Sequence, residues 1–170
     1  MNSGMSAAAG RLGQKTAAVF LAGGGLLGLA NVIRIGLYVA QRHMNFDVLP
    51  AFMSVAIFVC CISTGIGLWR AVPWGLRLAT ILLALQIPLF NIGRFVYEFS
   101  ALLSVRLLIG DTSSHFLPDI GSSFNVALLL EPVGLRFGIN IVAAAMLAFL
   151  IWVSRSDLKQ KRGRNGPVKD

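Results

Sequence analysis

The sequence predicts an all-α membrane protein, a bundle of four transmembrane helices with an extracytoplasmic segment between the third and fourth helices. Of its 170 residues, 56% are hydrophobic and only 13% are charged, whereas soluble domains carry about 25% charged residues. The apolar residues also form four long blocks, each close to the ~20 residues that cross a ~30 Å hydrocarbon core. These blocks do not alternate as barrel strands do, so helices are the expected spans.

The boundaries of the elements follow from these blocks. The spans are expected at about 16–40, 49–69, 76–97 and 137–154, within one transmembrane domain of residues 16–155. The flanking regions are a disordered cytoplasmic N-terminus (1–15), an outer segment (99–136) and a basic cytoplasmic tail (156–170). The first block is longer than the 7–15-residue apolar core of a secretory signal, so we expect it to be a retained span.

Basic residues predict the orientation, because short loops that stay in the cytoplasm collect Lys and Arg. With four spans, most of the basic residues fall on the side of the two termini: Arg11, Lys15, Arg70, Arg77, Arg155, Lys159, Lys161, Arg162, Arg164 and Lys169. Both termini are therefore expected in the cytoplasm, with the chain in a plasma membrane of the bacterial inner-membrane type. The net charge is +8, and the basic residues flank apolar spans. They therefore predict binding of anionic lipid at the tail, or of a specific partner there, rather than binding of nucleic acid.

Two spans carry helix-packing features. Gly24 and Gly28 in the first span form the small-xxx-small pattern that lets two helices approach closely. The alternative for this glycine run is a hinge or the lining of a pore. In the third span, Pro88 removes a backbone donor and predicts a kink, and Gln86 is placed to satisfy the freed carbonyl or to bond another helix.

Polar residues recur in the first and third spans at offsets of three and seven residues, which share one helix face. The two sets are Asn31, Arg34 and Tyr38, and Asn91, Arg94 and Glu98. Because odd-numbered spans run in the same direction, both sets are expected at similar depth, as one polar cluster near the outer surface. The alternatives are arginines that snorkel to the interface and a solute site.

The outer segment has two alternating apolar stretches, 100–110 and 122–131, separated by residues typical of turns. This pattern favours a β-hairpin between the two stretches. An extension of the third helix followed by an amphipathic interfacial helix is the alternative.

Catalytic and metal-binding patterns are not found in the sequence. The two histidines, His43 and His115, lie outside the predicted spans and far from cysteine or carboxylate clusters. The adjacent Cys60 and Cys61 are expected to act as small hydrophobes. No phosphate-binding loop, nucleophile elbow or metalloprotease helix occurs, so we expect no catalytic residue, metal or cofactor.

The sequence therefore predicts a small, non-enzymatic membrane protein: a helper, sensor or subunit of a membrane assembly. Its expected partners are the lipid bilayer and either another membrane protein or further copies of itself. The alternative function is a small channel or transporter for an anionic or polar solute, assembled around the Gly24 and Gly28 face with the arginines in its vestibule.

Overall fold

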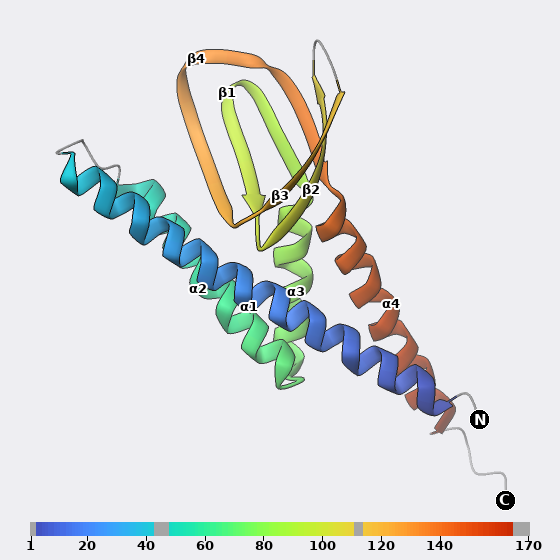
Figure 1. The fold of residues 1–170 in the computed structure, drawn as a ribbon. Coiled ribbons are helices and arrows are strands. Elements are labelled where there is room, and N and C mark those ends of the chain that lie inside the picture. Colours follow the sequence, from blue (N-terminus) through green and yellow to red (C-terminus); the bar gives the residue numbers. More distant parts are fainter. Residues whose placement is uncertain (1–2, 43–47, 111–113, 165–170) are drawn as a thin grey trace, which may run out of the picture.

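The computed structural model describes residues 3–42, 48–110 and 114–164, and contains four helices and a four-stranded antiparallel sheet (Figure 1). The elements in chain order are α1 (Ser3–Gln41), α2 (Val48–Trp69), α3 (Pro73–Gln86), β1 (Pro88–Ser100), β2 (Leu103–Gly110), β3 (Ser114–Ile120), β4 (Ser123–Asn140) and α4 (Ile141–Arg164). The expected all-α four-helix bundle is therefore wrong, because much of the second half of the chain is sheet.

The helices α1 and α2 form a long antiparallel hairpin. A side chain at Gly28 would overlap the ring of Phe58, and a Cβ at Gly65 would lie 2.7 Å from the carbonyl oxygen of Ala18. Close approach of the two helices thus depends on small residues, as in membrane helix pairs. α2 covers the apolar block 49–69, whereas α1 begins at Ser3, so the N-terminal segment expected to be disordered is helical from that residue.

The third apolar block, 76–97, is not one helix. α3 starts with Pro73 in its first turn, where the missing N–H costs nothing, and ends at Gln86 after 14 residues. β1 begins at Pro88, and the following residues are rich in the aromatic and β-branched side chains that favour strands. The expected proline kink is instead the boundary between a helix and a strand.

The sheet has the strand order β1-β4-β2-β3, with all neighbours antiparallel. β2 and β3 form a hairpin, while β4 lies between β1 and β2 and pairs with both. The segment 99–136 is therefore β structure, but its pairing differs from the expected hairpin between 100–110 and 122–131. The turn-rich stretch between them is itself largely the strand β3.

β1 and β4 bend back on themselves as one ribbon (Figure 1). The bend in β1 lies at Gly93, which has a φ of 58° and opposes Val133. This left-handed conformation favours glycine because it has no Cβ. The register shifts on both sides of Gly93, so that 88–91 pair with 136–139 and 95–100 pair with 123–128. The two arms of β1 consequently face each other.

The fourth helix begins later than expected. Residues 137–140 belong to β4, and α4 starts at Ile141 rather than at 137. Asn140 explains this boundary, because its side-chain oxygen accepts a hydrogen bond of 3.3 Å from the backbone N–H of Ala143. Such a bond satisfies one of the free donors at a helix N-terminus.

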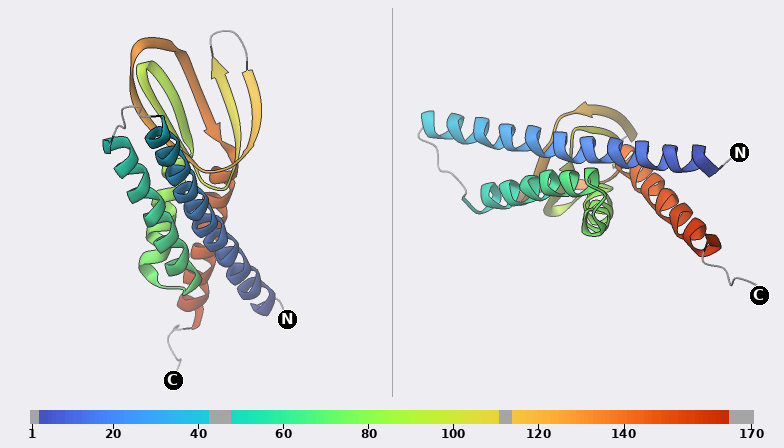
Figure 2. Two further views of the ribbon diagram at one scale, coloured as in Figure 1. Left: turned by 60° about the vertical axis from the view of Figure 1, so that its left-hand side comes forward. Right: turned by 90° about the horizontal axis from the view of Figure 1, so that it is seen from below.

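Helices and sheet share one apolar core. Phe99 of β1 and Ala101, directly after this strand, are buried together with Leu21, Phe58 and other helical residues. Figure 2 (left) shows the start of α1 and the end of α4 at one end of the molecule and the sheet at the other. Of the described helices, α1, over Gly10–Gln41, and α2 are long and apolar enough to cross a membrane; the apolar part of α4, Ile141–Arg155, is shorter.

Candidate functional site

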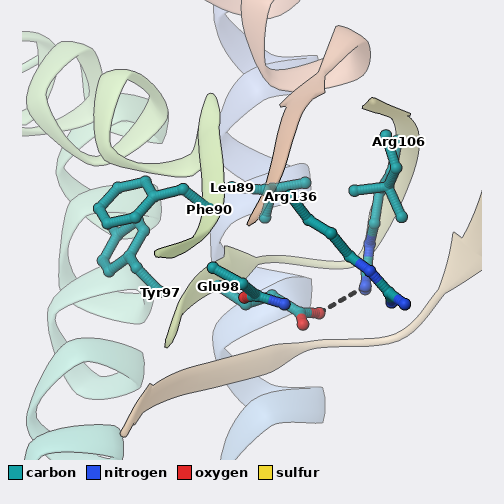
Figure 3. A pocket seen from close by; sticks show the side chains of 8 residues that line it. Leu89, Phe90, Tyr97, Glu98, Arg106 and Arg136 are labelled. Carbon is teal, nitrogen blue, oxygen red and sulfur yellow. Dashed lines mark ion pairs between the residues drawn. The ribbon is translucent and has the colours of Figure 1, made fainter. Parts of the chain in front are cut away.

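The bent ribbon of β1 and β4, together with β2, lines a partly open pocket of about 170 Å³ whose walls are both polar and apolar (Figure 3). The residues that line it are Leu89, Phe90, Asn91, Tyr97 and Glu98 of β1, Arg106 and Leu108 of β2, and Arg136 of β4. Both arms of β1 contribute, so the pocket exists because the strand turns at Gly93. Its charged side chains are one carboxylate and two guanidinium groups.

Arg106 is the centre of an ion-pair network at one end of this pocket. Its guanidinium lies 2.5 Å from a carboxylate oxygen of Glu98 and 2.6 Å from one of Asp119. Its Nε donates to the hydroxyl of Ser104 at 3.2 Å. Glu98 also accepts a hydrogen bond of 3.1 Å from the hydroxyl of Ser123. The network joins all four strands of the sheet.

Arg136 supplies a second guanidinium, which points in Figure 3 toward the end of the pocket where Glu98 meets Arg106. Arg136 is exposed, and within the described part of the chain it forms no ion pair. Asn91 lies opposite it in the β1–β4 register and also lines the pocket. An arginine and an amide N–H₂ in one small pocket can donate several hydrogen bonds to an oxyanion.

The opposite wall of the pocket is aromatic. The rings of Phe90 and Tyr97 stack across the two arms of β1, with centroids 5.3 Å apart. The Tyr97 hydroxyl donates to the carbonyl oxygen of Leu85 at 2.8 Å, which ties this wall to the last turn of α3. Burial raises the pKa of Tyr97 above its ordinary value, so the hydroxyl stays protonated and able to donate this bond well above neutral pH.

The six residues expected to form one polar cluster lie in two places. On α1, Arg34 donates to the side-chain oxygen of Asn31 at 3.2 Å, and Arg42 lies over the ring of Tyr38. Asn91, Arg94 and Glu98 lie on β1 instead of a helix. Of these three, Asn91 and Glu98 line the pocket and Arg94 does not. Among the described contacts, none joins Arg34 to Glu98.

The packing residues have defined positions. A Cβ at Gly24 would lie 2.6 Å from that of Ala101 and 2.9 Å from the backbone nitrogen of Leu102, and Gly28 faces Phe58. The glycine face of α1 is therefore covered within the chain, by the β1–β2 turn and by α2. Gln86 is fully buried, and neither atom of its amide has a hydrogen-bond partner among the described residues.

Sequence reasoning missed Arg106, Asp119 and Arg136 as site residues. Arg106 lies opposite Leu117 and Asp119 lies opposite Ser104 in the β2–β3 hairpin, and Arg136 is the last residue of the expected outer segment. Polar residues at alternating positions of a strand, such as Ser104 and Arg106, are the signal that could have indicated a shared face. The bend that brings in Arg136 has no comparable signal.

Metal-binding clusters of three or more His, Cys, Asp or Glu side chains do not occur among the described residues. Cys60 and Cys61 are free thiols on α2, and His43 lies outside the described residues. Comparisons with protein-family models, with curated proteins and with solved structures found no match to this chain.

Proposed function

We propose that this protein is a non-enzymatic subunit or sensor of a plasma membrane, of the bacterial inner-membrane type, that binds a small oxyanion or carboxylate in the pocket of its sheet. The observation that carries the proposal is Arg136, a guanidinium without an ion-pair partner among the described residues, at a pocket that Arg106 and Asn91 also line. Arginine suits this role because its planar group binds carboxylate and phosphate with two parallel hydrogen bonds.

Membrane insertion through α1 and α2 is supported by their exposed apolar surface. Only 39% of the apolar part of α1 and 33% of that of α2 are buried. A core helix of a soluble protein would be mostly buried, and α2 is too far from the N-terminus to be a signal sequence. The exposed side chains include Leu26, Ile33, Leu37, Leu49, Phe52 and Val59. We therefore propose that these side chains contact the hydrocarbon chains of the lipid bilayer.

We propose that both termini lie in the cytoplasm. Most of the basic residues lie near the two termini and in the connection between α2 and α3, which two spans place on the same side of the membrane. A single cysteine can test it in a variant that lacks Cys60 and Cys61. Gln41→Cys, at the exposed end of α1, should react with an impermeant thiol reagent in intact cells. Arg70→Cys, at the exposed end of α2, should react only after lysis. The opposite labelling pattern would reverse the orientation.

Anion binding is best tested with the purified protein in detergent. Isothermal titration with acetate, small dicarboxylates, phosphate and sulfate should reveal at least one ligand, and Arg136→Gln should weaken its binding at least about tenfold, since a charge-assisted bond contributes about 1.5–3 kcal/mol. Arg94→Gln is the matched control, because Arg94 is an exposed arginine of β1 outside the pocket. Equal affinity of the two variants would refute the site.

The channel alternative loses its main support. It depended on further copies packing around Gly24 and Gly28, whereas Ala101 and Phe58 occupy that face.

A further inference from the structure

A second hollow lies between α1 and α4, toward the chain ends and away from the sheet. It is an open groove of about 480 Å³, within the ~300–1,000 Å³ range of small-molecule sites. Its apolar lining comes from Leu12, Gly13 and Ala17 of α1 and from Ala145, Met146 and Phe149 of α4. The remaining lining residue is Thr16, whose hydroxyl is already bonded to the carbonyl oxygen of Leu12 at 3.0 Å.

Small residues make this groove. A side chain at Gly13 would overlap the ring of Phe149, so the two helices touch at that point. Beside this contact, Ala17 is 1% exposed and forms a floor, and Ala145 is an exposed wall too short to fill the space. The groove is therefore narrow and apolar, and the one polar side chain that lines it already has a hydrogen bond. Such a groove suits an alkyl chain and not a polar ligand.

Cations lie at the end of the groove nearest the chain ends. Arg11 directly precedes Leu12, and Arg155 is six residues beyond Phe149; both are exposed. On the same part of α1, the Lys15 ammonium lies 5.1 Å from the centre of the Trp69 ring. Tryptophan and basic side chains together are typical of the level of lipid headgroups. An apolar groove with arginines near one end is complementary to a lipid that has an apolar chain and an anionic headgroup.

We propose that this groove binds one acyl chain of an anionic phospholipid, with its phosphate near Arg11 and Arg155. The proposal rests on the membrane insertion proposed above and is independent of the pocket in the sheet. The net charge of +8 favours an anionic over a zwitterionic headgroup. The bound lipid would join the two ends of the chain, since α1 supplies one wall and α4 the other.

The test uses the full chain in nanodiscs of equal parts phosphatidylglycerol and phosphatidylcholine, followed by native mass spectrometry. We expect the wild type to retain one phosphatidylglycerol per chain in several-fold excess over phosphatidylcholine. Ala145→Phe, which fills the groove, should lose the bound lipid. Ala148→Phe is the matched control, an exposed alanine of the same helix that does not line the groove. The double variant Arg11→Gln, Arg155→Gln should retain lipid without the headgroup preference.

Each other outcome overturns the proposal in a recognisable way. Equal lipid retention by the two phenylalanine variants would show that the groove is not the site. If the wild type retained both lipids equally, the proposed selectivity for an anionic headgroup would be refuted. A dimer that Ala145→Phe dissociates would show that a second copy covers the groove. A chain that fails to enter nanodiscs would refute membrane insertion itself, whereas entry without lipid selection refutes only the groove.

Discussion

Replacing Arg106 by glutamine should destabilise the protein more than any single change to its partners. Arg106 is the only cation that the described contacts give to both Glu98 and Asp119. Its loss strands two carboxylates and leaves the Ser104 hydroxyl without its donor. Glu98→Gln, by contrast, leaves Arg106 paired with Asp119, and Asp119→Asn leaves it paired with Glu98. The expected order of destabilisation is therefore Arg106→Gln, then Glu98→Gln, then Asp119→Asn.

The magnitudes follow from how far each side chain is removed from water. The exposed fractions are 16% for Arg106, 29% for Glu98 and 48% for Asp119. Exposed pairs contribute ~0.2–1 kcal/mol, and breaking a fully buried pair costs ~3–5 kcal/mol. The pair of Arg106 with the half-exposed Asp119 should contribute close to the value of an exposed pair. The pair of Arg106 with Glu98 should contribute an amount between the values of exposed and buried pairs. We expect losses of about 2–3, 1–2 and below 1 kcal/mol for the three variants in that order.

Thermal unfolding in detergent, followed by circular dichroism, measures these losses. For a chain of this length, 1 kcal/mol shifts Tm by roughly 2–4 °C, so Arg106→Gln should lower Tm by about 4–12 °C. A double-mutant cycle of Glu98→Gln with Arg106→Gln should show a coupling of about 1–2 kcal/mol. The same cycle with Arg34→Gln is the control and should be additive. Coupling to Arg34 with additivity to Arg106 would refute the structural assignment.

Three further variants test packing, buried polarity and backbone strain, each by thermal unfolding in detergent. Gly28→Ala should destabilise the protein by about 1–3 kcal/mol, because the added methyl group would overlap the ring of Phe58. Gly36→Ala on the same helix is the control and should not destabilise it, because the space around Gly36 is open. Gln86→Met should stabilise by up to about 1–3 kcal/mol, the cost of an unsatisfied buried amide; destabilisation would show that the amide is bonded in the folded protein. Ala71→Gly should stabilise by about 1 kcal/mol, since Ala71 has a φ of 56°, while Ala84→Gly in α3 should cost ~0.5–1 kcal/mol.

The helical parts of the fold could be read closely from apolar blocks. The block 49–69 matches α2, and the apolar stretch after 16 lies within α1. The error lay at 88–97 and at 137–140, where apolar residues form strands. Hydropathy does not separate a buried strand from a helix, and the β4 residues that pair with 88–97 lie 29 to 51 residues away in the chain. Pro88 and Gly93 were the local signals against a continuous helix.

The site was harder to predict than the fold, because it depends on how a strand bends. Asn91 and Glu98 were identified as polar residues of interest, and both line the pocket. Their companions Arg106 and Arg136 fall within the expected outer segment, 99–136, and were not identified as site residues. Arg136 reaches the pocket because β4 follows β1 around the turn at Gly93. Long-range geometry of this kind has no local pattern in the sequence.

The spacing of Arg94 and Glu98 means different things on a helix and on a strand. Four residues are one turn of a helix, so a helical Arg94 would be the nearest cation to Glu98. On a strand the same four residues span roughly 13 Å at ~3.3 Å per residue, and the charged neighbours of a side chain come from other strands of the sheet. Glu98 accordingly pairs with Arg106 of β2, while Arg94 stays exposed. The repeated Asn-x-x-Arg pattern thus places Arg34 beside Asn31 on a helix but separates Arg94 from the pocket that Asn91 lines.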